Sequence, residues 1–181
     1  DLLDNFARGH FFEKMTASEI VQQVNSVRDG DFVTRKLTMH LMDRRGRERV
    51  RETFGFRKYY DNEKHSVLFY RSPANVKGTA FLTWDYPDVD VDDDQWLYMP
   101  AIRKVRRISA SDRGDYFLGT DFTYEDIKLE GKLSMSDYEY TLIDEEVVDG
   151  VLLYKMGSLP RTKEIAKELG YGRTEFWVNS S

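Results

Sequence analysis

Alternation of apolar and polar residues constrains the fold of this chain more than any other feature. From Asp31 onward, two successive runs carry their apolar residues on one side: Val33, Leu37, Met39 and Leu41, then Val50, Phe54 and Phe56. A period of two is typical of strands, and the segment Arg44-Arg45-Gly46 between the runs has the composition of a turn. The pattern predicts a long antiparallel hairpin.

Seven further segments are predicted to be strands: His65–Arg71, Thr79–Tyr86, Gln95–Met99, Lys104–Ile108, Tyr138–Val148, Val151–Met156 and Thr174–Val178. The pair Asp149-Gly150 is a strong hairpin signal between two of them. Helical periodicity is confined to Thr16–Val27, which opens with capping-box spacing at Thr16 and Glu19, and to Thr162–Leu169, with one helical turn expected over Asp121–Asp126.

Roughly nine strands joined by short connections, with no strand–helix–strand repeat, predict a mainly β (α+β) fold with an antiparallel sheet. A twisted sheet of that size curls, and a half-open barrel with a helix over its mouth would cover its edges. We expect one domain over residues 1–181.

The composition narrows the class of protein. Hydrophobic residues make up 40% of the chain and charged residues 33%, as in soluble globular proteins. The net charge of -5 argues against nucleic acid as a partner, and the lack of cysteine excludes disulfides, thiolate metal sites and cysteine nucleophiles. The chain starts without Met or a leader, so we expect either an internal segment or a mature chain whose signal peptide has been removed.

No motif of an enzyme is present. His10, His40 and His65 lie apart, and neither HExxH nor GxSxG occurs. The five aspartates of the loop Pro87–Asp94 suggest a calcium site, but the central glycine and final glutamate of an EF-hand are missing, which favours a solvated turn. We therefore expect no enzyme activity, no cofactor and no metal site.

Two kinds of side chain remain as candidates for binding. Basic residues gather around Lys104–Ile108 and again between Arg44 and Arg51; they either protect an edge strand and pair with acids, or contact anionic head groups. Aromatic residues make up 14% of the chain, and they either fill a core or line a cavity for an apolar ligand.

Three strings carry a resemblance to a known family: SPANVKGTAFLTWDYP from Ser72, DDDQWLYMPAIRKVRRIS from Asp92 and GDYFLGTDFTYEDI from Gly114. Through them the stretch Ser72–Ile127 strongly resembles the outer-membrane lipoprotein-sorting, LolA-like family of Gram-negative bacteria, in its branch of uncharacterised periplasmic proteins. A looser resemblance, through LMDRRGRERVRE and on to Met156, covers most of the chain.

The resemblance implies a half-open antiparallel barrel whose apolar cavity lies under a helical lid. It implies a non-enzymatic periplasmic carrier that binds acyl chains of lipoproteins or lipids, touches membranes transiently and delivers its cargo towards the outer membrane. It also implies association with RND-type exporters, so the alternative is an interaction subunit that docks on such an exporter. The family domain normally continues with strands beyond the point corresponding to Trp177, so the last strands are expected to be missing here.

The predicted sites lie within the matched stretch. The wall or rim of the cavity is predicted to comprise Leu82, Trp84, Trp96 and Tyr98, with Phe122 and Tyr124 near its mouth. Arg103, Arg106 and Arg107 are predicted to dock an anionic head group or a membrane-protein partner.

Overall fold

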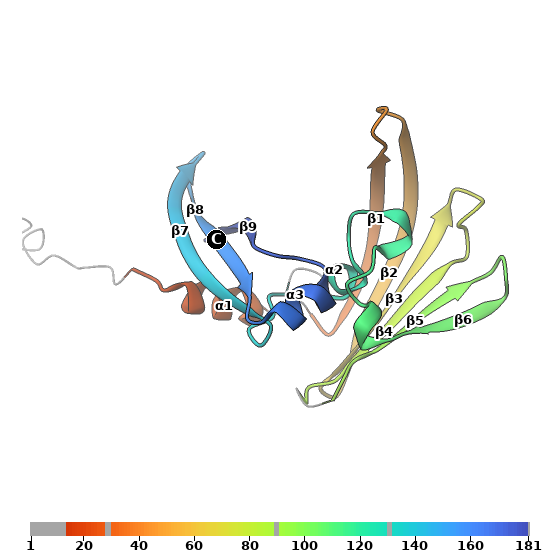
Figure 1. The fold of residues 1–181 in the computed structure, drawn as a ribbon, viewed down its shortest axis with the longest axis horizontal. Coiled ribbons are helices and arrows are strands. Elements are labelled where there is room, and N and C mark those ends of the chain that lie inside the picture. The colour runs from red at the N-terminus through yellow and green to blue at the C-terminus, as the bar shows by residue number, and fades with distance from the viewer. Residues whose placement is uncertain (1–13, 28–29, 89–90, 130–131, 181) are drawn as a thin grey trace, which may run out of the picture. The chain divides into compact units, whose positions relative to one another are not determined.

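The computed structural model describes residues 14–27, 30–88, 91–129 and 132–180. These residues form two antiparallel sheets, one of six strands and one of three (Figure 1). They divide into two compact units. Unit 1 comprises the described residues within 1–27, 132–161 and 172–181, and unit 2 those within 28–131 and 162–171.

Unit 2 contains the six-stranded sheet, in which each strand pairs with the next one in the chain. The strands are β1 (Phe32–Met42), β2 (Glu48–Tyr60), β3 (Glu63–Ser72), β4 (Ala80–Asp85), β5 (Asp94–Met99) and β6 (Lys104–Ile108). Short connections between consecutive strands allow only this antiparallel order. The predicted long hairpin is confirmed as the β1–β2 pair.

One face of the six-stranded sheet carries the core of unit 2. The segment after β6 folds over this face as two 3-10 turns and a short helix: η1 (Ala110–Asp112), η2 (Phe117–Gly119) and α2 (Tyr124–Leu129). Phe81 of β4 lies 5.1 Å from the ring of Phe117 and 5.5 Å from that of Tyr124, measured between centroids. Leu68, Tyr70 and Leu97 belong to the same buried cluster, so the side chains of β3, β4 and β5 that point this way are withdrawn from solvent.

The helix α3 (Lys163–Leu169) also belongs to unit 2. The hydroxyl of Thr162 accepts a hydrogen bond from the backbone N–H of Ile165, and Gly170 ends the helix with φ +79°, a left-handed conformation that favours glycine. Sequence periodicity predicted this helix and both of its ends, and the structure confirms them.

Unit 1 contains the three-stranded sheet of β7 (Tyr138–Val148), β8 (Val151–Pro160) and β9 (Thr174–Asn179), packed against α1 (Ala17–Ser26). The predicted capping box of α1 is present: Thr16 accepts from the N–H of Glu19, and the Glu19 carboxylate accepts from the N–H of Thr16 at 2.7 Å. The core of this unit is small, with Ile20, Val21 and Met156 buried.

Two predicted boundaries differ from the structure. The helical turn expected over Asp121–Asp126 starts three residues later, as α2 at Tyr124. Thr123 and Asp126 form a reciprocal cap there: each backbone N–H is bonded to the other residue's side chain, at 2.7 and 3.1 Å. The strand predicted to end at Met156 continues to Pro160 as β8, because it pairs with both of its neighbours.

The prediction of a mainly β, antiparallel architecture is confirmed. Within the described residues the strands form two sheets and no barrel closes, so the half-open barrel with a helical lid stays a prediction, as does the single carrier domain. None of the helices in the described part of the chain is long and apolar enough to cross a membrane.

Candidate functional site

The second face of the six-stranded sheet, opposite to α2, is covered by aromatic and aliphatic side chains. We call it the aromatic face and define it by eight residues: Phe54, Phe56, Val67, Phe69, Leu82, Trp84, Trp96 and Tyr98. They alternate along their strands with the core residues that α2 and η2 cover, because successive side chains of a strand point to opposite faces.

Strand register brings these side chains together. Residues directly opposite one another on antiparallel strands point to the same face. One row across the sheet runs through Phe56, Val67, Leu82 and Trp96, and the next through Phe54, Phe69, Ala80 and Tyr98. The aromatic face is thus contiguous over β2 to β5.

The aromatic side chains of this face touch one another but stay open to solvent. The ring centroids of Trp84 and Trp96 are 5.3 Å apart, and those of Phe56 and Phe69 are 6.3 Å apart. Phe56, Phe69, Trp84 and Tyr98 are each 37–39% exposed. A contiguous apolar surface of this kind marks a site of interaction with an apolar partner.

Polar groups border the aromatic face. The His65 ring stacks on Trp84 at 4.7 Å, with an interplanar angle of 7°, and its Nε2 lies 3.0 Å from a carboxylate oxygen of Glu63. The guanidinium of Arg71 lies 5.5 Å above the ring of Phe54. An apolar surface with a charged margin suits an amphiphilic ligand, whose tail needs apolar contact and whose head needs a polar partner.

The structure groups four of the six predicted cavity residues and separates the other two. Leu82, Trp84, Trp96 and Tyr98 share the aromatic face. Tyr124 is 6% exposed and lies in the core on the opposite face, while Phe122, in the loop before α2, is 55% exposed.

Sequence reasoning did not assign the aromatic residues of β2 and β3 to the site. The alternation in Val50–Phe56 placed Phe54 and Phe56 on one side of their strand, which is the available signal. The alternation does not show that Phe54 and Phe56 lie on the same face of the sheet as Trp84, because the shared face depends on how β3 pairs with β2 and with β4.

The predicted docking arginines do not form one surface. Arg106 and Arg107 are consecutive in β6 and therefore point to opposite faces. Arg106 is bonded to Asp112 at 3.0 Å and Arg107 to Asp94, whereas Arg103 lies in the turn before β6 with φ +51°. Their docking role stays a prediction.

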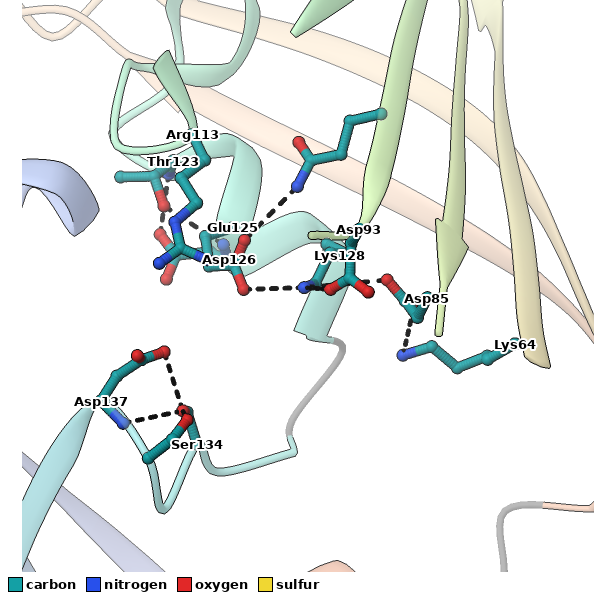
Figure 2. A network of polar contacts seen from close by, with 12 residues as sticks. Lys64, Asp85, Asp93, Arg113, Thr123, Glu125, Asp126, Lys128, Ser134 and Asp137 are labelled. Carbon is teal, nitrogen blue, oxygen red and sulfur yellow. Dashed lines mark hydrogen bonds and ion pairs between the residues drawn. The ribbon is translucent and has the colours of Figure 1, made fainter. Parts of the chain in front are cut away.

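A buried charge network holds α2 over the sheet (Figure 2). The ammonium of Lys128, 6% exposed, lies 3.0 Å from Glu125 and 3.7 Å from Asp85, and it donates to Asp93. Asp85 also pairs with Lys64 at 2.7 Å. The network links α2 to β3, to β4 and to the residue preceding β5.

Burial and charge act in opposite directions on the pKa values of this network. Burial alone disfavours the charged form of Lys128, but the nearby carboxylates of Glu125, Asp85 and Asp93 raise its pKa above the ordinary value. Burial raises the pKa of Asp85, and Lys64 and Lys128 partly oppose that rise. Lys128 is protonated at neutral pH and is unsuited to act as a general base.

Two aspartates of the acidic loop, Asp93 and Asp94, are engaged in contacts within the protein. The Asp93 carboxylate accepts from the backbone N–H of Tyr86 at 2.9 Å, and Asp94 accepts from the Tyr86 hydroxyl at 2.9 Å. Asp90 lies outside the described residues. Where the chain is described, no group of three or more His, Asp or Glu side chains is arranged to hold a metal ion.

Comparison with known proteins gives matches to a family and to solved structures. A family model described as "Uncharacterized protein" matches residues 62–181. A DUF1329 family protein from Desulfovibrio piger is 29% identical, with a TM-score of 0.76 over 91% of this chain and 67% of that one. No functionally curated protein matches the chain.

Two further structures share the fold. A putative outer membrane lipoprotein-sorting protein domain from Vibrio parahaemolyticus is 24% identical, with a TM-score of 0.73 over 90% of this chain and 66% of that one. A LolA superfamily protein from Nitrosomonas europaea is 19% identical, with a TM-score of 0.56 over 92% and 67% of the two chains. The present chain spans about two thirds of the length of each of these structures.

Proposed function

We propose that this chain, which belongs to the family of uncharacterised proteins whose model matches residues 62–181, is a LolA-like carrier that holds acyl chains against the aromatic face. Its cargo is a lipoprotein or a lipid, and its place of action is the periplasm, where cargo moves towards the outer membrane. The observation that carries the proposal is the contiguous, solvent-open surface formed by Phe56, Phe69, Trp84 and Tyr98.

The physical need for such a carrier follows from the cost of exposing an acyl chain to water. A chain of ~14 methylenes loses about 11 kcal/mol of burial free energy on leaving a membrane, at about 0.8 kcal/mol per methylene. A protein that crosses an aqueous compartment with this cargo must offer comparable apolar area. The aromatic face supplies one wall of that site.

Release is the second requirement, and the chemistry of the aromatic face meets it. Flat aromatic rings on a sheet contact a chain without enclosing it, so binding depends on area rather than on a fitted pocket. No bond forms or breaks in such a transfer. The carrier therefore acts without an enzymatic step.

Substitution of two tryptophans tests the proposal. The Trp84→Ser/Trp96→Ser protein should bind a fluorescent long-chain fatty acid at least about tenfold more weakly than the wild type, because each truncated ring removes about 1–2 kcal/mol of apolar contact. The control is Trp177→Ser, which removes a tryptophan from β9 in unit 1 and should bind normally. Fluorescence titration gives the affinities, and lipid extraction of the purified wild type reports cargo already bound.

Two results would contradict the carrier. One is equal affinity of the double variant and the wild type for the fatty acid, which would mean that the acyl chain binds somewhere other than the aromatic face. The other is a wild type that is free of lipid and does not bind the probe. That second result favours the non-enzymatic interaction subunit that docks on an exporter.

A further inference from the structure

We propose that the turn between β1 and β2 docks this protein on the surface of a bilayer that contains anionic lipid. The element is the hairpin tip, defined as Met42–Val50. It shares no residue with the aromatic face, although Met42 and Val50 lie on the same side of the sheet, and it goes beyond acyl binding. Figure 1 shows this turn projecting beyond the turns that join β3 to β4 and β5 to β6 within the same sheet.

The hairpin tip is positive in a chain that is negative as a whole. Within Met42–Val50, four arginines stand against one aspartate and one glutamate, a net charge of +2, whereas the full chain has a net charge of -5. The arginines are Arg44, Arg45, Arg47 and Arg49. Such a local reversal of sign orients a protein towards a negative surface.

Both acids of the hairpin tip are used by the hairpin itself. The Asp43 carboxylate accepts from the backbone N–H groups of Arg45 and Arg47, at 2.8 and 3.0 Å, and from Nε of Arg47 at 2.7 Å. These bonds hold the pKa of Asp43 below its usual range, so the carboxylate stays ionised and in place. Glu48 lies 2.6 Å from Nδ1 of His40.

The side chains of Arg44 and Arg45 are left for an external anion. Both residues are exposed, and among the described residues neither forms an ion pair. Arg106 and Arg107 of β6 differ in this respect, because each of them pairs with an aspartate. The turn that Asp43 closes, with Gly46 at φ +75°, holds the backbone of Arg44 and Arg45 in a defined conformation.

Apolar side chains accompany these charges. Met42 is 72% exposed and Val50 is 41% exposed. The cross-strand pairs Met42 with Glu48 and His40 with Val50 put both apolar side chains on one face of the hairpin. Arginines beside an exposed methionine match a bilayer interface, where guanidinium groups meet phosphates and apolar side chains enter the boundary of the acyl region.

Vesicle flotation of the full chain tests the proposal. Wild type should float at low salt with vesicles that contain one third phosphatidylglycerol, and only weakly with phosphatidylcholine alone. Arg44→Ala/Arg45→Ala should lower partitioning onto the anionic vesicles about 25-fold, since each arginine near such a surface contributes roughly fivefold. High salt should reduce binding of the wild type towards that of the variant. Met42→Ser should weaken binding at both salt concentrations.

Two matched variants test whether vesicle binding depends on positive charge and on its place in the hairpin tip. Arg44→Lys/Arg45→Lys keeps both charges and should bind as the wild type does, because a lipid surface reads charge rather than the shape of the guanidinium group. Lys163→Ala/Lys167→Ala removes two exposed charges from α3 and should also leave binding unchanged. Loss of vesicle binding in the lysine variant would mean that the shape of the guanidinium group, and not its charge, is recognised, and would overturn the proposal. So would equal flotation of the wild type and the double alanine variant, or a wild type that does not float with anionic vesicles.

The result is independent of the carrier experiment. Trp84→Ser/Trp96→Ser should still bind anionic vesicles, and Arg44→Ala/Arg45→Ala should still bind the soluble fatty acid. Failure of only one assay therefore identifies which surface was assigned wrongly. Circular dichroism shows that each variant is folded before it is compared.

Discussion

At the scale of single residues, Lys128 is the side chain whose loss should harm the fold most. Lys128→Met keeps the length of the side chain but leaves Asp85, Asp93 and Glu125 close together without their shared cation. Removing one partner of a buried ionic group costs about 3 kcal/mol or more, and urea unfolding at neutral pH should show that loss of unfolding free energy. Lys167→Met, on the exposed side of α3, is the control and should change it by less than about 0.5 kcal/mol.

The pH dependence of the unfolding free energy, compared between the wild type and Lys128→Met, tests the charge state of Lys128. The pKa of Lys128 is raised in the folded state, so its stabilisation is fully present below the ordinary value of 10.5 and is lost as pH rises through the folded pKa. The wild type should therefore lose stability above pH 10.5 by an amount that Lys128→Met lacks. Equal slopes of the two proteins in alkali would contradict the assignment.

At the scale of elements, the contact of α3 with the loop after η1 requires a glycine. A Cβ atom at Gly114 would lie 2.7 Å from the backbone carbonyl carbon of Leu169, where rigid backbone cannot give way. Gly114→Ala should separate the two segments, lengthen the 3.0 Å ion pair of Arg113 with Glu168, and cost about 2 kcal/mol in urea unfolding. Gly172→Ala meets no atom within 4 Å and should be neutral; a similar loss in both variants would rule out the steric cause.

Local signals made most elements predictable from the sequence. The capping box at Thr16, the turn at Asp149-Gly150 and the left-handed glycine after α3 act within a few residues of the boundary that they set. The start of α2 was misplaced because the cap at Thr123 ends in aspartate instead of the usual glutamate or glutamine.

At the scale of the whole molecule, the two units have cores of unequal size and should unfold at different denaturant concentrations. Three buried side chains form the core of unit 1, and eight form that of unit 2. Trp177 reports on unit 1, and Trp84 and Trp96 report on unit 2. Trp84→Phe/Trp96→Phe keeps only the tryptophan of unit 1, and Trp177→Phe keeps only those of unit 2. In urea, the fluorescence of the first variant should change at a lower midpoint than that of the second, because less apolar surface stabilises unit 1. Coincident midpoints would mean a single cooperative transition.

Long-range pairing limited what the sequence could say about the site. Leu82 and Trp84, and Trp96 and Tyr98, share a face by alternation, and their strands are neighbours in the chain, so this half of the aromatic face was predictable. Tyr124 was predicted near the mouth of the cavity, but it packs against Phe81 and Phe117 in the core, and alternation does not report such packing. Strands that are apolar on both sides also hide which side is the core.

The aromatic face of unit 2 sets the requirements of ligand binding against those of folding and expression. Four of its rings are more than one third exposed, so they add less to folding than buried rings do and they favour self-association. A selection for expression level alone would reward polar side chains at Phe56, Phe69, Trp84 and Tyr98, because such changes cost the fold little. Substitution by threonine and lysine at these four positions would mark a homologue or an evolved variant that still folds but no longer binds its ligand.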